Sequence, residues 1–179
     1  MSTNRGICVY NPEDSSVTNY DVMDGLQSNE FNTGAYYLSE KGEMFFGGIN
    51  GFNIFEPNSI RNNPYKPPVR ITEISIYNKP IEPEQEGLLK QCIAQTDEIH
   101  LSHDQNFLSF EFAAFNYIRP EKNNYQYKME GLDENWVFSG NRNYASYPDM
   151  KPGKYTFQVI GSNNDGLWNH NPTKLQITV

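Results

Sequence analysis

The stretch that decides the fold lies at residues 125–136 and reads Tyr-Gln-Tyr-Lys-Met-Glu-Gly-Leu-Asp-Glu-Asn-Trp. Two later stretches continue the pattern: Tyr-Ala-Ser-Tyr-Pro-Asp-Met-Lys-Pro-Gly-Lys-Tyr-Thr-Phe at 144–157, and Gly-Ser-Asn-Asn-Asp-Gly-Leu-Trp at 161–168. Apolar and polar residues alternate within the runs, and glycines separate one run from the next. Alternation with a period of two is typical of half-buried antiparallel strands. These stretches therefore predict strands joined by tight turns.

The same alternation extends over residues 69–179. Apolar parity changes at Thr72-Glu73, which predicts a β-bulge there. About seven strands in a segment of this length indicate an immunoglobulin-like or fibronectin-like β-sandwich, without the disulfide of antibody domains because no Cys pair lies on facing strands. The residues predicted to face the core are Leu108, Phe110, Phe112, Ala114, Tyr125, Tyr127, Met129, Tyr155, Phe157, Val159, Leu175, Ile177 and Val179.

Residues 1–60 read as short strands separated by turn residues. Gly42 offers a positive φ for a tight hairpin. Strands at this spacing indicate one blade of a β-propeller or a small sandwich. The run at 6–10 reads as the middle of a strand, so we expect a longer protein around this chain. The predicted strands are Gly6–Tyr10, Val17–Tyr20, Ala35–Leu38, Glu43–Gly47 and Gly51–Phe55.

A linker is predicted at residues 61–68, because Pro64, Pro67 and Pro68 cluster there. Proline lacks a backbone donor and favours extended chain, so this linker should be stiff. The chain is thus divided into a blade-like fragment at 1–60, the linker, and a sandwich at 69–179. Within the sandwich, residues 84–95 could form either a short helix or, over Leu88–Ala94, a strand.

Composition excludes several classes of partner. The net charge of −8 argues against nucleic acid and anionic membrane, which attract Lys and Arg. No apolar run approaches the ~20 residues that span a bilayer. Cys8 and Cys92 each lie in an apolar run, which predicts buried free thiols.

No catalytic, cofactor-binding or metal-binding residue is predicted. His100 and His103 have a ligand-like spacing but lie in a strand-and-turn region, and a zinc site needs a third ligand. The sequence Asn-Asn-Asp-Gly at 163–166 lacks the later Glu of a calcium loop, so a tight turn is expected. Glu111 is predicted to face solvent, and no second carboxylate pairs with Asp133 or Glu134 for hydrolysis.

Particular residues nevertheless match a known arrangement. Those in the second half are Tyr127, Gly131, Trp136, Tyr147, Pro152, Gly153, Tyr155, Asn163, Asp165, Gly166 and Trp168; those in the first half are the runs at 5–12 and 47–57. Residues 69–179 resemble the Y_Y_Y (triple-tyrosine) domain of bacterial hybrid two-component sensors. Residues 1–60 resemble the end of the propeller that precedes it. The naming tyrosines are taken as Tyr127, Tyr147 and Tyr155, with Tyr144 a rival for the middle position.

The resemblance implies a function without catalysis in this segment. It implies a periplasmic relay within a sensor histidine kinase and response regulator, coupling glycan sensing by an upstream propeller to a transmembrane kinase, with polysaccharide utilisation as the regulated process. A homodimer through the sandwich or the blade edge is expected, with Trp136 and Trp168 as interface candidates. No nucleic acid and no membrane contact is expected for this segment itself.

Two other functions stay open from the sequence. The chain could be a carbohydrate-binding accessory module of a glycoside hydrolase, with Trp136, Trp168, Tyr36 and Tyr37 as a platform for sugar rings. It could also be an adhesion or scaffolding sandwich. The three naming tyrosines are interpreted as core and corner residues, with buried rings and with hydroxyls bonded to the backbone.

Overall fold

The computed structural model describes residues 1–13, 15–84 and 87–179. They form two compact units, residues 1–62 and residues 63–179. Apart from four short 3-10 turns, the regular elements of the described residues are all strands. This confirms the predicted all-β class. The boundary falls inside the predicted linker, and residues 63–68 belong to the second unit.

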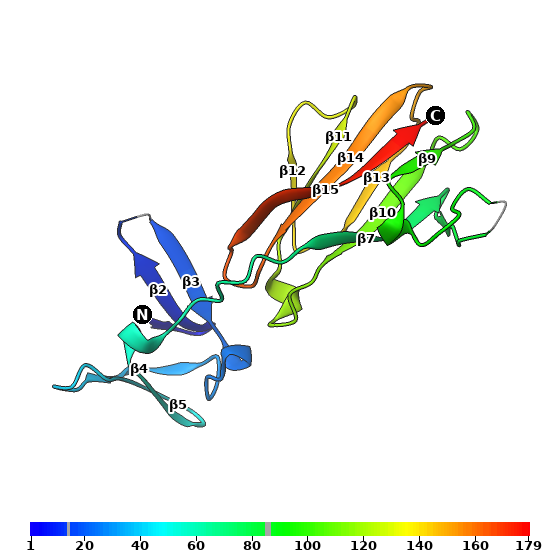
Figure 1. The fold of residues 1–179 in the computed structure, drawn as a ribbon. Coiled ribbons are helices and arrows are strands. Elements are labelled where there is room, and N and C mark those ends of the chain that lie inside the picture. The colour runs from blue at the N-terminus through cyan, green and yellow to red at the C-terminus, as the bar shows by residue number, and fades with distance from the viewer. Residues whose placement is uncertain (14, 85–86) are drawn as a thin grey trace. The chain divides into compact units, whose positions relative to one another are not determined.

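The second unit is a sandwich of two sheets (Figure 1). Its four-stranded sheet has the order β13-β10-β7-β8, and its five-stranded sheet has the order β12-β11-β14-β15-β9. Neighbouring strands are antiparallel except β15 and β9, which are parallel. The strands are β7 Val69–Ile76, β8 Lys79–Pro80, β9 Glu98–His100, β10 Leu108–Ala114, β11 Tyr125–Glu130, β12 Val137–Gly140, β13 Tyr144–Tyr147, β14 Lys154–Ser162 and β15 Trp168–Thr178.

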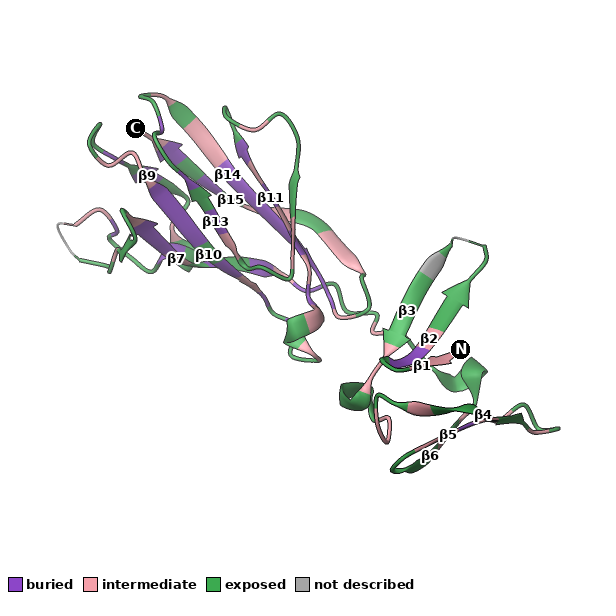
Figure 2. Ribbon diagram, turned by 180° about the vertical axis from the view of Figure 1, so that it is seen from behind, coloured by how far each residue is buried: buried purple, intermediate pink, exposed green. Residues whose placement is uncertain are grey.

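Aromatic rings from both sheets form the centre of the sandwich core. Phe110 of β10 and Phe157 of β14 stack face to face, with ring centroids 4.1 Å apart. Phe112 lies 6.2 Å from Phe157 between ring centroids, and all three phenylalanines are fully buried. The predicted alternation holds on β10, where Leu108, Phe110, Phe112 and Ala114 are buried and Glu111 is exposed. Figure 2 shows this burial along the strands of the sandwich.

The predicted bulge is present in β7. Ile71 pairs with Phe112 and Glu73 pairs with Glu111, so Thr72 is the extra residue. The insertion lets Ile71 and Ile74, three residues apart, both be buried. Without it, the period of two would turn one of these isoleucines to the outer face of the sheet.

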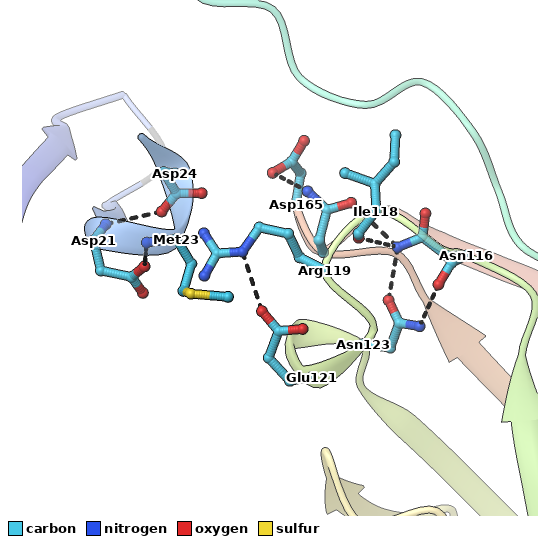
Figure 3. Close-up of polar contacts among 10 residues, drawn as sticks. Asp21, Met23, Asp24, Asn116, Ile118, Arg119, Glu121, Asn123 and Asp165 are labelled. Carbon is cyan, nitrogen blue, oxygen red and sulfur yellow. Dashed lines mark hydrogen bonds and ion pairs between the residues drawn. The ribbon is translucent and has the colours of Figure 1, made fainter. Parts of the chain in front are cut away.

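The first unit contains two three-stranded sheets. Their orders are β1-β2-β3 and β4-β5-β6. The assignment of this unit to a propeller blade stays a prediction. A 3-10 turn, η1 (Val22–Asp24), separates the sheets; Asp21 and Asp24 cap it reciprocally and Gly25 ends it with φ 94° (Figure 3). The strands are β1 Ser2–Thr3, β2 Gly6–Asn11, β3 Ser16–Tyr20, β4 Phe31–Leu38, β5 Met44–Gly48 and β6 Gly51–Phe55, followed by η2 Pro57–Ser59.

Two local expectations fail. Both cysteines are free, but Cys92 is exposed and Cys8 is only half-buried. The described part of 84–95 contains neither an α-helix nor a strand; its regular element is the 3-10 turn η3, Ile93–Gln95. Residues 85–86 lie outside the described residues. Leu89 and Ile93 are buried in the sandwich core from this irregular segment, so its apolar residues reflect tertiary packing and not strand pairing. The last 3-10 turn is η4, Pro120–Lys122.

Candidate functional site

The motif residues gather in three places within residues 63–179. We call these the tyrosine corner, the hairpin turn and the edge patch. The tyrosine corner contains Tyr127, Gly131, Asp133, Tyr147, Pro152, Gly153 and Tyr155; the hairpin turn is residues 163–167; the edge patch contains Trp136, Phe138 and Trp168.

Two of the naming tyrosines belong to the core. The ring centroids of Tyr127 and Tyr147 lie 6.2 Å apart in an edge-to-face arrangement, and each is within 6.3 Å of the Phe157 ring centroid. Both residues are only 8% exposed. Tyr144, the rival for the middle position, is half-buried on the same strand. Of these two residues of β13, Tyr147 is the one that is buried.

Asp133 holds the hydroxyl of Tyr147. Its Oδ2 accepts a hydrogen bond of 2.6 Å from that hydroxyl and one of 2.7 Å from the backbone N–H of Met129. Burial raises the pKa of the Tyr147 phenol, and the adjacent Asp133 carboxylate raises it further. The sequence interpretation placed backbone partners at the tyrosine hydroxyls and missed this carboxylate. A turn Asp after an alternating strand gives little local sign of a buried partner.

Tyr155 occupies a gap between two glycines. A Cβ on Gly131 would lie 2.8 Å from Cδ1 of Tyr155, and one on Gly153 would lie 3.3 Å from its hydroxyl. The hydroxyl donates a 2.9 Å hydrogen bond to the carbonyl of Lys151, next to the exposed Pro152. Gly131 also has a φ of 97°, which L side chains rarely adopt. The glycines of the motif thus make room for its third tyrosine.

The hairpin turn joins β14 to β15. The Oδ1 of Asn163 accepts 2.9 Å hydrogen bonds from the backbone N–H groups of Asp165 and Leu167, while Gly166 takes a φ of 78°. The expected tight turn is therefore present. The Nδ2 of Asn163 reaches out of the turn to the carbonyls of Asn63 and Tyr65, at 2.7 and 2.8 Å. Those two residues lie in the predicted linker.

The edge patch lies beside β12, the edge strand of the five-stranded sheet. Phe138 is 62% exposed and Trp136 is 39% exposed. The ring of Trp168 is 6.3 Å from that of Phe138 between centroids. An exposed aromatic cluster beside a sheet edge is typical of a protein-contact surface. The structure adds Phe138 to the two predicted tryptophans.

Two of the four aromatics considered for sugar stacking, Tyr36 and Tyr37, do not share one face of their sheet. Tyr36 and Tyr37 are consecutive residues of β4, so their side chains lie on opposite faces of the sheet. Trp136 and Trp168 lie in the other unit. The ring of Tyr37 instead contacts that of Phe45, with ring centroids 5.8 Å apart. The Phe45 ring in turn lies 6.4 Å from the Phe52 ring between centroids.

The residues considered for acid–base catalysis or metal binding do not form a site in the described part of the chain. Glu111 is exposed, and Asp133 is engaged by Tyr147. Within residues 1–13, 15–84 and 87–179, no three His, Cys, Asp or Glu side chains gather as metal ligands would. A helix long and apolar enough to cross a bilayer is likewise missing from the described part of the chain.

Comparison with known proteins agrees with this geometry. The Y_Y_Y domain family matches residues 116–179. The chain is 40% identical over 181 residues to histidine kinase P4 of Formosa agariphila, and spans 13% of that relative's length. The sequence resemblance to two-component sensors is therefore confirmed.

Solved structures match the chain over both units. The extracellular domain of the hybrid two-component system BT3049 from B. thetaiotaomicron is 29% identical with a TM-score of 0.77, and the match covers 99% of this chain and 24% of that one. That of the hybrid two-component system BT4673 from the same organism is 26% identical, with a TM-score of 0.58 and coverages of 99% and 23%. These relatives confirm the predicted location outside the cytoplasmic membrane.

Replacing Tyr147→Phe tests the tyrosine corner. The free energy of unfolding should fall by about 1.5–3 kcal/mol, because a buried hydrogen bond to a charged acceptor is lost. Both tryptophans of the chain, Trp136 and Trp168, lie in the sandwich, so their fluorescence during denaturant unfolding reports on that unit. Tyr144→Phe, on the same strand, is the matched control and should change the stability little.

The same pair of proteins has a defined pH dependence. The pKa of Tyr147 is raised in the folded state, so its contribution is present below the unfolded-state pKa of about 10 and is lost as pH rises above it. Wild-type stability should therefore fall above about pH 10 more steeply than that of Tyr147→Phe, by up to about 1.4 kcal/mol per pH unit. Parallel pH profiles would contradict the assignment.

Proposed function

We propose that this chain is a non-enzymatic, periplasmic signal-relay segment of a sensor histidine kinase. The observation that carries the proposal is the match to extracellular domains of two-component systems across both units, residues 1–62 and 63–179. The relay would connect a ligand-binding region earlier in the parent to its kinase.

The first unit supports a β-propeller upstream. The sheet β4-β5-β6 is apolar on both faces: Tyr37, Phe45 and Ile54 pair across one face, and Phe46 stacks on Phe55 on the other, with ring centroids 5.7 Å apart. Tyr37 and Ile54 are 61% and 50% exposed. A sheet with two apolar faces needs a layer on each side. Adjacent blades of a propeller would provide these layers.

A glycan is the proposed signal, sensed by the propeller and not by the sandwich. The rival function is a carbohydrate-binding accessory module, which would bind sugars by itself. The placement of Tyr36 and Tyr37 on opposite faces of their sheet favours the relay. Calorimetric titration of the 179-residue chain with oligosaccharides should give no binding heat. Micromolar affinity would favour the accessory module.

The relay is tested in the whole histidine kinase. Residues 63–179 are replaced by an unrelated β-sandwich of similar size that lacks the Y_Y_Y motif. Ligand binding by the upstream region should persist, whereas ligand-dependent autophosphorylation should fall to the basal rate. A chimaera that still responds to ligand would show that the sandwich is a passive spacer.

The edge patch is the proposed homodimer contact, in agreement with the expected sandwich-mediated dimer. Phe138→Ser should weaken self-association at least tenfold in sedimentation equilibrium, because an exposed aromatic side chain is removed from the contact. Tyr117→Ser is the control, since Tyr117 is 86% exposed and lies outside the patch. A wild-type chain that stays monomeric at millimolar concentration would count against the contact.

A further inference from the structure

The segment at 63–69 is held to the sandwich through alternate carbonyl groups. Asn163 donates to the carbonyls of Asn63 and Tyr65, Asn169 donates to that of Pro67 at 3.1 Å, and the hydroxyl of Thr173 donates to that of Val69. Prolines at 64, 67 and 68 lack N–H groups, so an ordinary strand ladder is not available. Side chains of the β14–β15 hairpin take its place.

Asn163 is the centre of this arrangement. It is 0% exposed, and its amide makes four hydrogen bonds, two donated to linker carbonyls and two accepted from its own turn. An asparagine amide offers two donor hydrogens and two acceptor lone pairs. Its hydrogen-bonding capacity is therefore filled. The donors hold the linker, and the acceptors hold the turn.

Asn63 has its own contacts with the same turn. Its backbone N–H donates to Asp165 at 2.6 Å, and its Nδ2 donates to Asn164 and Asn116 at 3.0 and 3.1 Å. Asn116 is in turn bonded to the buried Asn123 at 2.8 Å (Figure 3). The point where the second unit begins is thus fixed by both its main chain and its side chain.

The other end of the segment packs on a glycine. A Cβ on Gly161 of β14 would lie 2.8 Å from Cγ2 of Val69. Gly161 is buried, so it allows Val69, the first residue of β7, to approach β14 more closely than another residue would. Residues 63–69 are therefore held both by hydrogen bonds to their carbonyl groups and by the close packing of Val69 on Gly161.

We propose that residues 63–69 and the β14–β15 hairpin form a rigid coupling seat, with Asn163 as its positioning residue. A displacement of the chain at Asn63 is then passed directly to β14. This inference rests on the proposed relay function and specifies the element through which the relay acts. The side chains of Asn169 and Thr173 add hydrogen bonds to the carbonyls of Pro67 and Val69. At the other end of the segment, Asp165 accepts a hydrogen bond from the backbone N–H of Asn63.

Asn163→Asp separates the seat from the turn. The retained Oδ1 still accepts from Asp165 and Leu167, but a carboxylate oxygen replaces the Nδ2 donor against two carbonyls. In the 179-residue chain, hydrogen exchange at the backbone amides of Asn63 and Tyr65, the hydrogen-bonded amides of 63–66, should accelerate at least tenfold, whereas exchange in β10 and β11 stays unchanged. Equal exchange at 63–66 in wild type and variant would overturn the seat.

Two further variants keep this test decisive. Asn169→Asp is the second variant: it removes the donor to Pro67 and leaves an acceptor for the N–H of Asn171, so it should loosen the segment even if Asn163→Asp fails to fold. Asn123→Ala is the control, because Asn123 is 1% exposed but bonds Asn116 and not the linker carbonyls. It should leave exchange at 65–66 unchanged.

The signalling readout distinguishes the seat from the relay itself. In the whole sensor, Asn163→Asp should keep ligand affinity and basal autophosphorylation but reduce the ligand-induced increase at least fivefold. If the passive-sandwich chimaera described above still responds, the relay function fails whatever the exchange result. If the chimaera is unresponsive but Asn163→Asp signals fully with a loosened 63–66 segment, the seat is overturned alone.

Discussion

The stacking of Phe110 on Phe157 joins the two sheets of the sandwich at its centre, with 4.1 Å between ring centroids. Phe112, Tyr127 and Tyr147 surround this pair at centroid distances near 6 Å. Because these rings are bulky and closely packed, they leave the sheets little freedom to slide. The position of each motif residue on β11, β13 and β14 follows from this contact.

Strand β14 connects the packed core to the turn that contains Asn163. Phe157 and Val159 are fully buried, and burial continues through Gly161 and Ser162 to Asn163 in the turn. The seat for residues 63–69 is therefore built on a strand that is buried from Phe157 to Ser162. A binding element supported in this way keeps its geometry better than one on an exposed loop. This is the physical reason why the hairpin is suited to a relay.

Much of the sandwich could be predicted from the sequence, because the information is local. Alternation placed the core face of β10, and the parity change placed a bulge at Thr72-Glu73, where the strand register confirms it. The seat could not be predicted in the same way. Asn163 and Asn63 are 100 residues apart, and the asparagine-rich run indicates only a turn when read locally. A proline-rich segment whose carbonyls need donors was the available signal, but it does not identify the donors.

The wrong prediction for Cys92 has a physical cause in the sandwich. Cys92 was assigned to a buried run because Leu89 and Ile93 are apolar; these two residues are indeed buried, but from a segment without strand geometry. Apolar content alone does not give side-chain direction.

The most direct test of the account is whether residues 63–66 move with the sandwich. Backbone ¹⁵N relaxation of the 179-residue chain measures this on the ps–ns timescale. The account predicts order parameters of about 0.85 for the amides of Asn63 and Tyr65, equal to those of β14. Values below about 0.6, typical of a flexible linker, would contradict it.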